Sequence, residues 1–306
     1  MEPGVAINHA LHTARCILAG KLMLVSLLAL AGAAAAADPD SAATAASNGN
    51  SFIDAWFATS DAAKEAQPHW MTPVVTVTPR LEQEYRYDQS WQNRGDFVDQ
   101  TSYGGGKGLE LIPTLNTEVI IGVPAYQTRN RPAGKIDGLA DDTLLLKYRF
   151  LSANEESGNY IVTGFMGVSV PVGSQTFTEH TFIYTPTLAA GKGWGTREAG
   201  FDIQSTLGIS LPAAYLKDQG RPIAWNTAFQ AHVFEKFWPE VEANYTYYKD
   251  GPNDGNHQLA LTGGLVLGRF ELTRRARLIL GGGYQKVVSS FHTFDHTWLA
   301  TARLAF

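Results

Sequence analysis

From Pro73 onward, apolar and polar side chains alternate with a period of two residues. In the segment 73–87, Val75, Val77 and Leu81 share one parity with two tyrosines, and two threonines followed by four charged residues fill the other parity from 76 to 86. A β-strand puts the two parities on opposite faces, whereas an α-helix would spread both around its surface. The pattern therefore predicts a strand with one apolar and one charged face. The segment is longer than most strands of globular proteins, which suits a tilted membrane crossing.

This alternation recurs along the rest of the chain. It is clear at 116–123, 143–150, 201–211, 223–233, 240–247 and 258–267, weaker at 103–111, 160–170, 182–188 and 278–284, and clear again in the last segment, 298–306. A membrane leaves no backbone polar group unpaired, so strands can cross it only as a closed barrel. We therefore expect an all-β fold over residues 73–306: a transmembrane antiparallel up-and-down β-barrel of about 12 strands, an even number as in single-chain bacterial barrels.

The charged parity predicts which side chains face the interior. An Arg or Lys that faces lipid at mid-depth costs about 2–4 kcal/mol, so the charged face must line the lumen. The candidate lumen and solute-path residues are Arg80, Glu82, Glu84, Arg86, Glu118, Lys147, Arg149, Asp202, Glu240, Glu242, Arg277 and Arg303. A lumen of mixed charge fits either a hydrated conduit that filters solutes or a paired network that fills the interior. The expected barrel size favours the conduit.

The last segment carries a second signal. Trp298, Leu304 and Phe306 share one parity, and Phe306 is the final residue. We expect these residues to form the membrane-insertion signal of an outer-membrane barrel, whose last strand closes against the first. The expected partners are therefore outer-membrane lipid, the barrel insertion machinery and a small-molecule solute. The net charge of −5 comes without a basic run, which argues against nucleic acid as a partner.

The N-terminus has the order of a secretory signal. Arg15 and Lys21 precede an apolar stretch at 22–30, and small residues follow as far as Ala37. This order predicts a signal peptide over residues 1–37, cleaved near Ala37, with an uncleaved membrane anchor as the alternative.

The segment after the expected signal peptide is a different region. Residues 38–72 are predicted to be a flexible periplasmic lead, in which 51–67 is weakly helical. That stretch fits a periplasmic helix or a plug, and equally an amphipathic surface turn. The only cysteine, Cys16, precedes the lead, so a processed chain would contain no thiol.

The expected connections also have a pattern. Polar stretches rich in Gly, Asp, Asn and Pro predict outer loops at 89–100, 127–138, 172–180, 212–221, 249–256 and 288–293. A glycine-rich inner connection is expected at 191–195. Aromatic residues near the strand ends predict interfacial girdles, at Tyr87, Tyr103, Tyr148, Tyr160, Trp225, Trp238 and Tyr247.

Three sets of short motifs carry a family resemblance. They lie at 69–73 with 77–82, at 186–195 with 201–205, and at 270–273 with 281–285. They resemble the bacterial family called MetA-pathway of phenol degradation, whose members are often described as outer-membrane transporters. The resemblance covers about residues 70–306. It implies the fold and an outer-membrane location, and it brings no catalytic residues.

Enzymatic chemistry has one candidate cluster. His292 and His296 lie near Ser289, Ser290 and Asp295. Residues four apart on a strand are separated by about 13 Å, so the two histidines cannot share a metal ion or a proton. We expect no enzyme and no cofactor. The predicted function is an outer-membrane channel or transporter for small solutes, aromatic or hydrophobic ones among them. The alternatives are a structural or ligand-binding barrel without an open pore, and a lipid-modifying enzyme.

Overall fold

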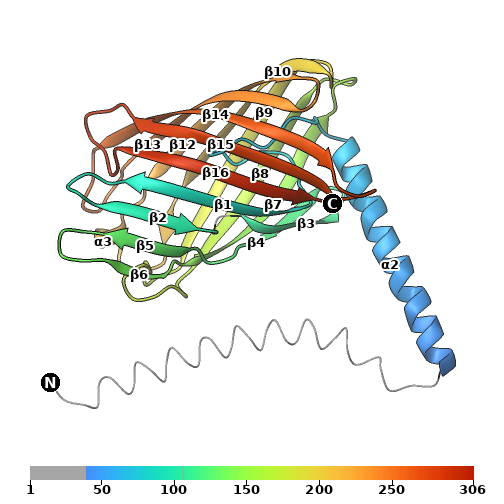
Figure 1. The fold of residues 1–306 in the computed structure, drawn as a ribbon, viewed down its shortest axis with the longest axis horizontal. Helices are drawn as coiled ribbons and strands as arrows, with labels where there is room; N and C mark the ends of the chain where they lie inside the picture. Colours follow the sequence, from blue (N-terminus) through green and yellow to red (C-terminus); the bar gives the residue numbers. More distant parts are fainter. Residues whose placement is uncertain (1–38, 106) are drawn as a thin grey trace. The chain divides into compact units, whose positions relative to one another are not determined.

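A computed structural model describes residues 39–105 and 107–306 (Figure 1). The predicted signal peptide, residues 1–37, lies outside the described residues. The first described element is the helix α2 (Pro39–Glu65), which includes most of the weakly helical stretch 51–67. The boundary between two compact units of the chain falls within α2, after Ala58. In the two described ranges, no helix is long and apolar enough to cross a membrane.

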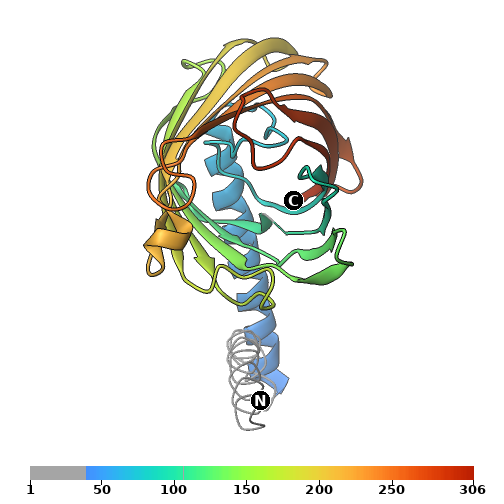
Figure 2. The same ribbon diagram turned by 90° about the vertical axis from the view of Figure 1, so that its left-hand side faces the viewer.

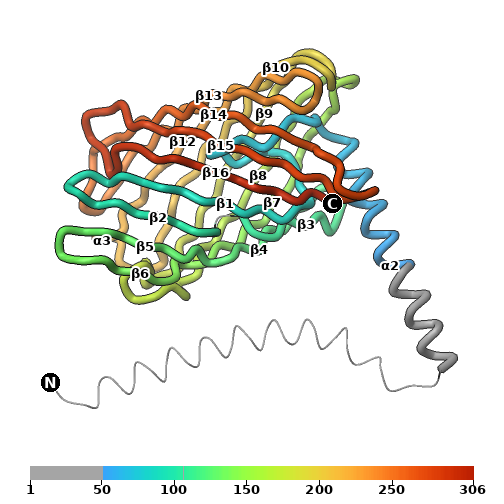
Figure 3. Tube along the Cα trace, viewed as in Figure 1, coloured from blue at the N-terminus to red at the C-terminus, as the bar shows by residue number. Residues whose placement is uncertain are grey.

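Antiparallel strands make up the second unit. They are β1 (Glu84–Asn93), β2 (Asp99–Tyr103), β3 (Gly108–Thr114), β4 (Thr117–Ile121), β5 (Tyr126–Asn130), β6 (Ile136–Leu139), β7 (Asp142–Ala153), β8 (Tyr160–Val170), β9 (Ile183–Gly195), β10 (Ala199–Ile209), β11 (Leu211–Pro212), β12 (Ile223–Val233), β13 (Phe237–Tyr247), β14 (His257–Glu271), β15 (Arg277–Val287) and β16 (His296–Ala305). A short helix, α3 (Leu216–Gln219), precedes β12. β16 lies beside β1 and closes the sheet (Figures 1 and 3), with Glu84 opposite Ala305 and Asn93 opposite His296.

Several of these strands are pieces of one longer wall strand. β1 pairs with both β2 and β3, β5 continues β4, β7 continues β6, and β11 continues β10. The sixteen pieces therefore form twelve wall strands, which confirms the predicted closed all-β barrel. The break between β2 and β3 contains Gly105, whose φ is +84°. A Cβ at Gly105 would lie 2.6 Å from the Cβ of Ala125, so only glycine fits there.

The outer face of the wall is apolar. Large hydrophobic side chains are exposed on most wall strands, among them Trp91, Leu144, Leu146, Leu188, Phe201, Leu207, Phe229, Val241, Leu280 and Trp298. Six of the seven predicted girdle aromatics are exposed as well: Tyr87, Tyr103, Tyr148, Tyr160, Trp225 and Tyr247. The prediction for Trp238 is wrong, because Trp238 shares its parity with Glu240 and Glu242 on β13. It is 2% exposed and stacks on His232, with 4.3 Å between ring centres.

Several predicted boundaries are also wrong. The outer loop expected at 89–100 includes the end of β1 and the start of β2, and the one expected at 127–138 includes most of β5 and β6. The first barrel strand does not begin at Pro73, since residues 66–83 form neither helix nor strand and β1 starts at Glu84. In this stretch both parities are buried, and only His69, Val75 and Val77 are half-exposed from 67 to 83. The glycine-rich connection expected at 191–195 is instead the end of β9.

Candidate functional site: a lumen closed by its own chain

Residues 66–83 connect α2 to β1, and we call them the lumen segment. Viewed along the barrel, this segment lies inside the ring of strands (Figure 2). It is coil with bends, so its backbone groups have no regular ladder to pair with. A buried backbone N–H or C=O without a partner is costly, and the partners must therefore come from other side chains. Most of the side chains that supply them are the charged residues of the wall.

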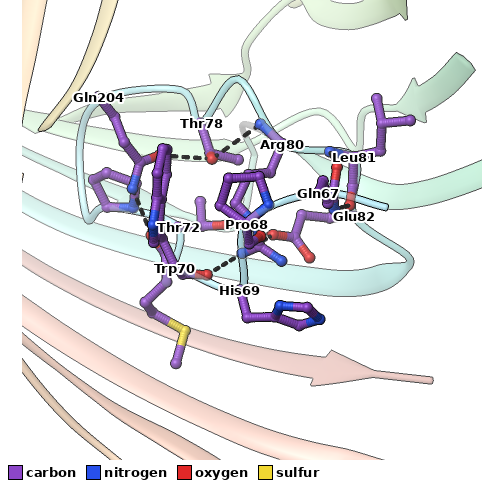
Figure 4. Close-up of polar contacts among 12 residues, drawn as sticks. Gln67, Pro68, His69, Trp70, Thr72, Thr78, Arg80, Leu81, Glu82 and Gln204 are labelled. Carbon is purple, nitrogen blue, oxygen red and sulfur yellow. Dashed lines mark hydrogen bonds and ion pairs between the residues drawn. The ribbon is translucent and has the colours of Figure 1, made fainter. Parts of the chain in front are cut away.

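The lumen segment first folds back on itself. The side chain of Gln67 donates to the carbonyl of Leu81 (2.8 Å) and accepts from the amide of Leu81 (2.9 Å). Arg80 donates to the carbonyls of Pro68 (2.6 Å) and Trp70, and it pairs with Glu82 (2.8 Å). These contacts, drawn in part in Figure 4, join the two ends of the segment into a compact loop.

Carboxylates of β13 bind the amides at the middle of the lumen segment. Glu240 accepts a hydrogen bond from the amide of Val74 (2.8 Å). Glu242, which is fully buried, accepts from the amides of Val75 (2.8 Å) and Thr76 (2.6 Å). Hydrogen bonds of this kind to a charged acceptor are stronger than neutral ones. The two glutamates therefore fix the backbone at three consecutive residues.

Guanidinium groups of the wall bind carbonyls of the lumen segment. Arg303 of β16 donates to the carbonyls of Thr72 (2.7 Å) and Pro73 (3.1 Å). Arg86 of β1 donates to the carbonyl of Val74 (2.9 Å). Acidic and basic wall residues thus divide the backbone of the lumen segment between them, carboxylates on amides and cations on carbonyls.

A second group of wall residues holds the end of the lumen segment nearest to β1. Lys147 donates to the carbonyl of Arg80 (3.0 Å) and forms an ion pair with Glu118 (3.0 Å). Glu118 in turn accepts from the amide of Glu82 (2.6 Å). Lys147 and Glu118 are both fully buried. Each member of this pair has a backbone partner as well as an ionic one, which offsets the cost of burying the two charges.

Gln204 of β10 connects the neutral parts of the lumen segment. Its side chain accepts from the hydroxyl of Thr78 (2.7 Å) and donates to the carbonyl of Met71 (2.9 Å) and to the carboxylate of Asp202 (2.9 Å). Gln204 is not among the predicted lumen residues, although it shares the parity of Asp202. Its polar, uncharged side chain at the parity of Asp202 is the sequence signal that identifies it as a lumen residue.

Trp70 is the apolar anchor of the lumen segment. It is 1% exposed and its indole N–H donates to Asn159 (2.8 Å), in the turn between β7 and β8. Two glycines of β9 make room for the ring, since a Cβ at Gly191 or Gly193 would lie 2.5 Å from it. The ring packs in a buried cluster that includes Ile161. Gly191 and Gly193 are thus required for close approach.

A polar contact at the rim joins the start of the lumen segment to the wall. Glu155, in the β7–β8 turn, accepts from the amide of His69 (2.5 Å) and contacts its ring nitrogen Nδ1 (2.8 Å). Burial by itself raises the pKa of Glu155, but the hydrogen bonds from His69 outweigh it and lower the pKa to about 2. Arg149 of β7 adds a contact to the carbonyl of Ala63 (2.7 Å).

Beside this rim lies a cavity of about 890 Å³. Its lining includes Arg277, a predicted lumen residue, which is exposed to this cavity and lies at the start of β15. The lining carries charges of both signs together with the aromatic side chains of Trp238 and Phe306. The cavity therefore forms a mixed-charge vestibule at the end of the barrel where β1 starts and β16 stops.

The predicted lumen residues now fall into groups. Most bind the lumen segment or its partners, and Arg80 and Glu82 belong to the lumen segment itself. Glu84 is buried on β1 opposite Glu110 of β3, a buried residue that the sequence analysis missed. One carboxylate oxygen of Glu84 and both of Glu110 have no hydrogen-bond partner among the described residues. Glu110 alternates with Leu109 and Leu111, which is the signal that would have found it. A role of these residues in a solute path stays a prediction.

The predicted insertion residues lie at the last strand. Trp298 and Leu304 of β16 are exposed on the outer face. Phe306 follows β16, and its amide donates to the carbonyl of Gln83 (3.1 Å). Their recognition by insertion machinery stays a prediction.

The histidine cluster does not assemble into a serine–histidine pair. The hydroxyl of Ser289 donates to the carbonyl of Phe291 (2.8 Å), and His292 contacts Asp295 (3.1 Å). His296 packs its ring near that of Tyr284. In residues 39–105 and 107–306, no group of three or more His, Cys, Asp or Glu side chains could hold a metal ion.

No protein-family model matches the chain, and no curated protein matches it. Among solved structures, it is similar to "KdgM porin" (8% identity, 72% of this chain and 99% of that chain, TM-score 0.41). It is also similar to the NanC porin (12%, 72% and 98%, 0.43) and to the COG4313 outer membrane channel from Pseudomonas putida F1 (12%, 72% and 93%, 0.48). All three identities are below 25% and all three TM-scores are below 0.5.

Proposed function

We propose that this chain is an outer-membrane channel for small solutes, closed in the described state by its own lumen segment. The apolar outer face supports a place in a membrane, because a barrel in water would not expose large hydrophobic side chains on most of its strands. The predicted signal peptide and the predicted insertion residues Trp298, Leu304 and Phe306 support the outer membrane as that place. Membership of the MetA-pathway family is part of the same proposal and rests on the motif resemblance.

The observation that carries the proposal is the way the lumen is filled. A barrel that serves only as a scaffold can fill its interior with side chains of its own wall. Here the wall instead binds the backbone of a separate segment, through residues such as Glu242 and Arg303. The lumen segment is coil and is held by side chains of the wall. It can therefore leave the lumen without breaking the pairing of any two strands. We propose that its displacement opens the path and that aromatic or hydrophobic solutes are among those that pass.

The alternative is a sealed barrel that binds a ligand or another protein. The buried Lys147–Glu118 pair favours it, because such a pair adds to a dense interior network. A lipid-modifying enzyme is less supported, because the serine and histidine side chains of the candidate cluster face other groups.

Planar-bilayer recording of the refolded full-length chain tests the proposal. A gated channel is expected to stay closed for most of the recording and to show discrete openings. A folded barrel that never conducts would contradict the channel and favour the sealed alternative.

A further inference from the structure

Three arginines meet at the other end of the barrel, where β1 stops. Arg94 lies in the hairpin between β1 and β2, Arg129 lies in β5, and Arg131 follows β5 directly. Gln100 of β2 is the strand partner of Arg129. Its side-chain oxygen accepts from Arg129 at Nε (2.9 Å) and Nη2 (2.8 Å), and from Arg94 at Nη1 (3.2 Å). We call Arg94, Arg129 and Arg131 the outer arginine cluster.

Arg129 and Gln100 face the lumen, and Arg94 contacts Gln100. Tyr103 and Tyr126 are strand partners on β2 and β5, they are exposed, and their rings lie 6.4 Å apart on the outer face. Gln100 and Arg129 each lie three residues from one of these tyrosines. Because successive side chains of a strand point to opposite faces, Gln100 and Arg129 point inward.

Two acidic side chains, one on β2 and one on the neighbouring strand β6, lie on the outer face. Asp99 accepts from the side chain of Asn93 (2.9 Å), and Asp137 accepts from the hydroxyl of Tyr126. The charged groups that act on Arg129 are the other two arginines of the cluster. The guanidinium groups of Arg94 and Arg129 both donate to a neutral acceptor, the side-chain oxygen of Gln100.

A further carboxylate lies on the neighbouring loop between β15 and β16. A Cβ added at Gly95 would lie 3.8 Å from a carboxylate oxygen of Asp295. Asp295 contacts the imidazole of His292 at 3.1 Å. The inner face at this mouth therefore keeps a local excess of positive charge around Arg129.

An aromatic ring lies against the cluster. The ring of Phe177 lies 5.1 Å from the guanidinium carbon of Arg129. Its loop is fixed to the wall, because the amide of Ser174 donates to the carbonyl of Leu139 (2.8 Å) and the amide of Phe177 donates to the carbonyl of Ser174 (2.8 Å). The mouth thus combines guanidinium donors with a held apolar surface.

We propose that the outer arginine cluster captures small organic carboxylates, and that aromatic carboxylates fit it best. The inference rests on the proposed channel function and names the class of solute. Guanidinium groups bind a carboxylate through two parallel hydrogen bonds, and the ring of Phe177 offers a surface to the rest of the solute. An excess of one sign of charge at a mouth raises the local concentration of the opposite ion, by a factor on the order of 10 or more.

The first test measures the local potential and needs no conduction. In the full-length chain with Cys16→Ser, we would introduce Ser102→Cys, two residues from Gln100 and on the same face of β2. Its rate of modification is measured with an anionic sulfonatoethyl thiosulfonate and with a cationic trimethylammonioethyl thiosulfonate. Replacing Arg94, Arg129 and Arg131 together by Gln is expected to lower the anion-to-cation rate ratio about tenfold.

The matched control for this test is Lys249→Gln. Lys249 is an exposed cation in the loop between β13 and β14, at the same end of the barrel. This substitution should leave the rate ratio unchanged. An unchanged ratio in the triple arginine variant would overturn the proposed capture site, whether or not the barrel conducts.

The second test measures selectivity with benzoate as the probe. The reversal potential across a gradient of potassium benzoate gives the permeability of benzoate relative to potassium. The triple variant is expected to lower this ratio about threefold to tenfold, and Lys249→Gln is expected to leave it unchanged. Conduction with an unchanged ratio in the triple variant contradicts the capture site. A silent wild-type barrel contradicts the channel function instead, and the thiol test then decides the site by itself.

Discussion

Replacing Glu242 by Gln tests the way the lumen is closed. The carboxylate accepts from two amides of the lumen segment, at 2.8 Å from Val75 and 2.6 Å from Thr76. A glutamine keeps one acceptor oxygen and places an NH₂ group against the second amide. One charge-assisted hydrogen bond is lost, which is worth about 1.5–3 kcal/mol, and a buried N–H loses its acceptor.

The expected size of the effect follows from these contacts. Every 1.4 kcal/mol is a factor of ten, so a loss of about 1.5–3 kcal/mol corresponds to about a 10- to 100-fold larger open population. The carboxylate of Glu240 lies two residues from Glu242, on the same face of β13. Removing the charge of Glu242 relieves the repulsion between the two, which offsets part of the loss. We therefore expect the lower end of the range, about tenfold.

The assay is the open probability in planar bilayers, at equal amounts of folded barrel. Glu156→Gln is the matched control, because Glu156 is an exposed glutamate in the β7–β8 turn. The control should open as often as the wild type. If Glu242→Gln also opens as often as the wild type, the wall carboxylates do not hold the lumen segment and the reasoning is refuted.

Three further predictions concern other parts of the molecule. Gly193→Ala puts a Cβ 2.5 Å from the indole nitrogen of Trp70, and overpacking of this kind costs about 1–3 kcal/mol. Protease cleavage within residues 66–83 should therefore rise about fivefold or more while the barrel stays intact. Unchanged cleavage would contradict the close fit. The pKa of Glu155, about 2, lies below its ordinary value, so its contact with His69 adds stability above about pH 4.3 that is lost as the pH falls toward 2. Thermal melts should show this acid loss in the wild type and not in Glu155→Gln, and equal pH dependence in both would count against the contact. Phe306→Ala should lower the amount of barrel inserted in cells while refolding in detergent is unchanged, and normal insertion would remove the insertion-signal role.

The wall of the barrel could be predicted because each side chain there faces either the apolar outside or the polar lumen. In the segment 146–150 apolar and charged residues alternate strictly, and this alternation alone gives the strand and its two faces. The breaks at Gly105 and around Ala125 could not be placed, since they depend on a close approach between two strands. Trp238 was assigned to the wrong face because its position near a strand end outweighed its parity.

The lumen segment could not be separated from the first strand by alternation. Val75, Val77 and Leu81 alternate with polar residues as in a strand, but these polar side chains bind within the barrel interior instead of lining a wet face. Pro73 and Pro79 were the available signal, because proline cannot donate to a strand ladder. Which wall charge binds which backbone group depends on the register of distant strands, and no local pattern encodes it.

The central claim is that buried wall charges bind the backbone of residues 66–83, and hydrogen–deuterium exchange on the refolded barrel in detergent tests it most directly. The amides of Val74, Val75, Thr76 and Glu82 donate to buried glutamates of the wall. They are therefore predicted to exchange as slowly as amides of β13 and β14. Exchange of these four amides at the rate of an unstructured peptide, with the wall strands still protected, would contradict the account.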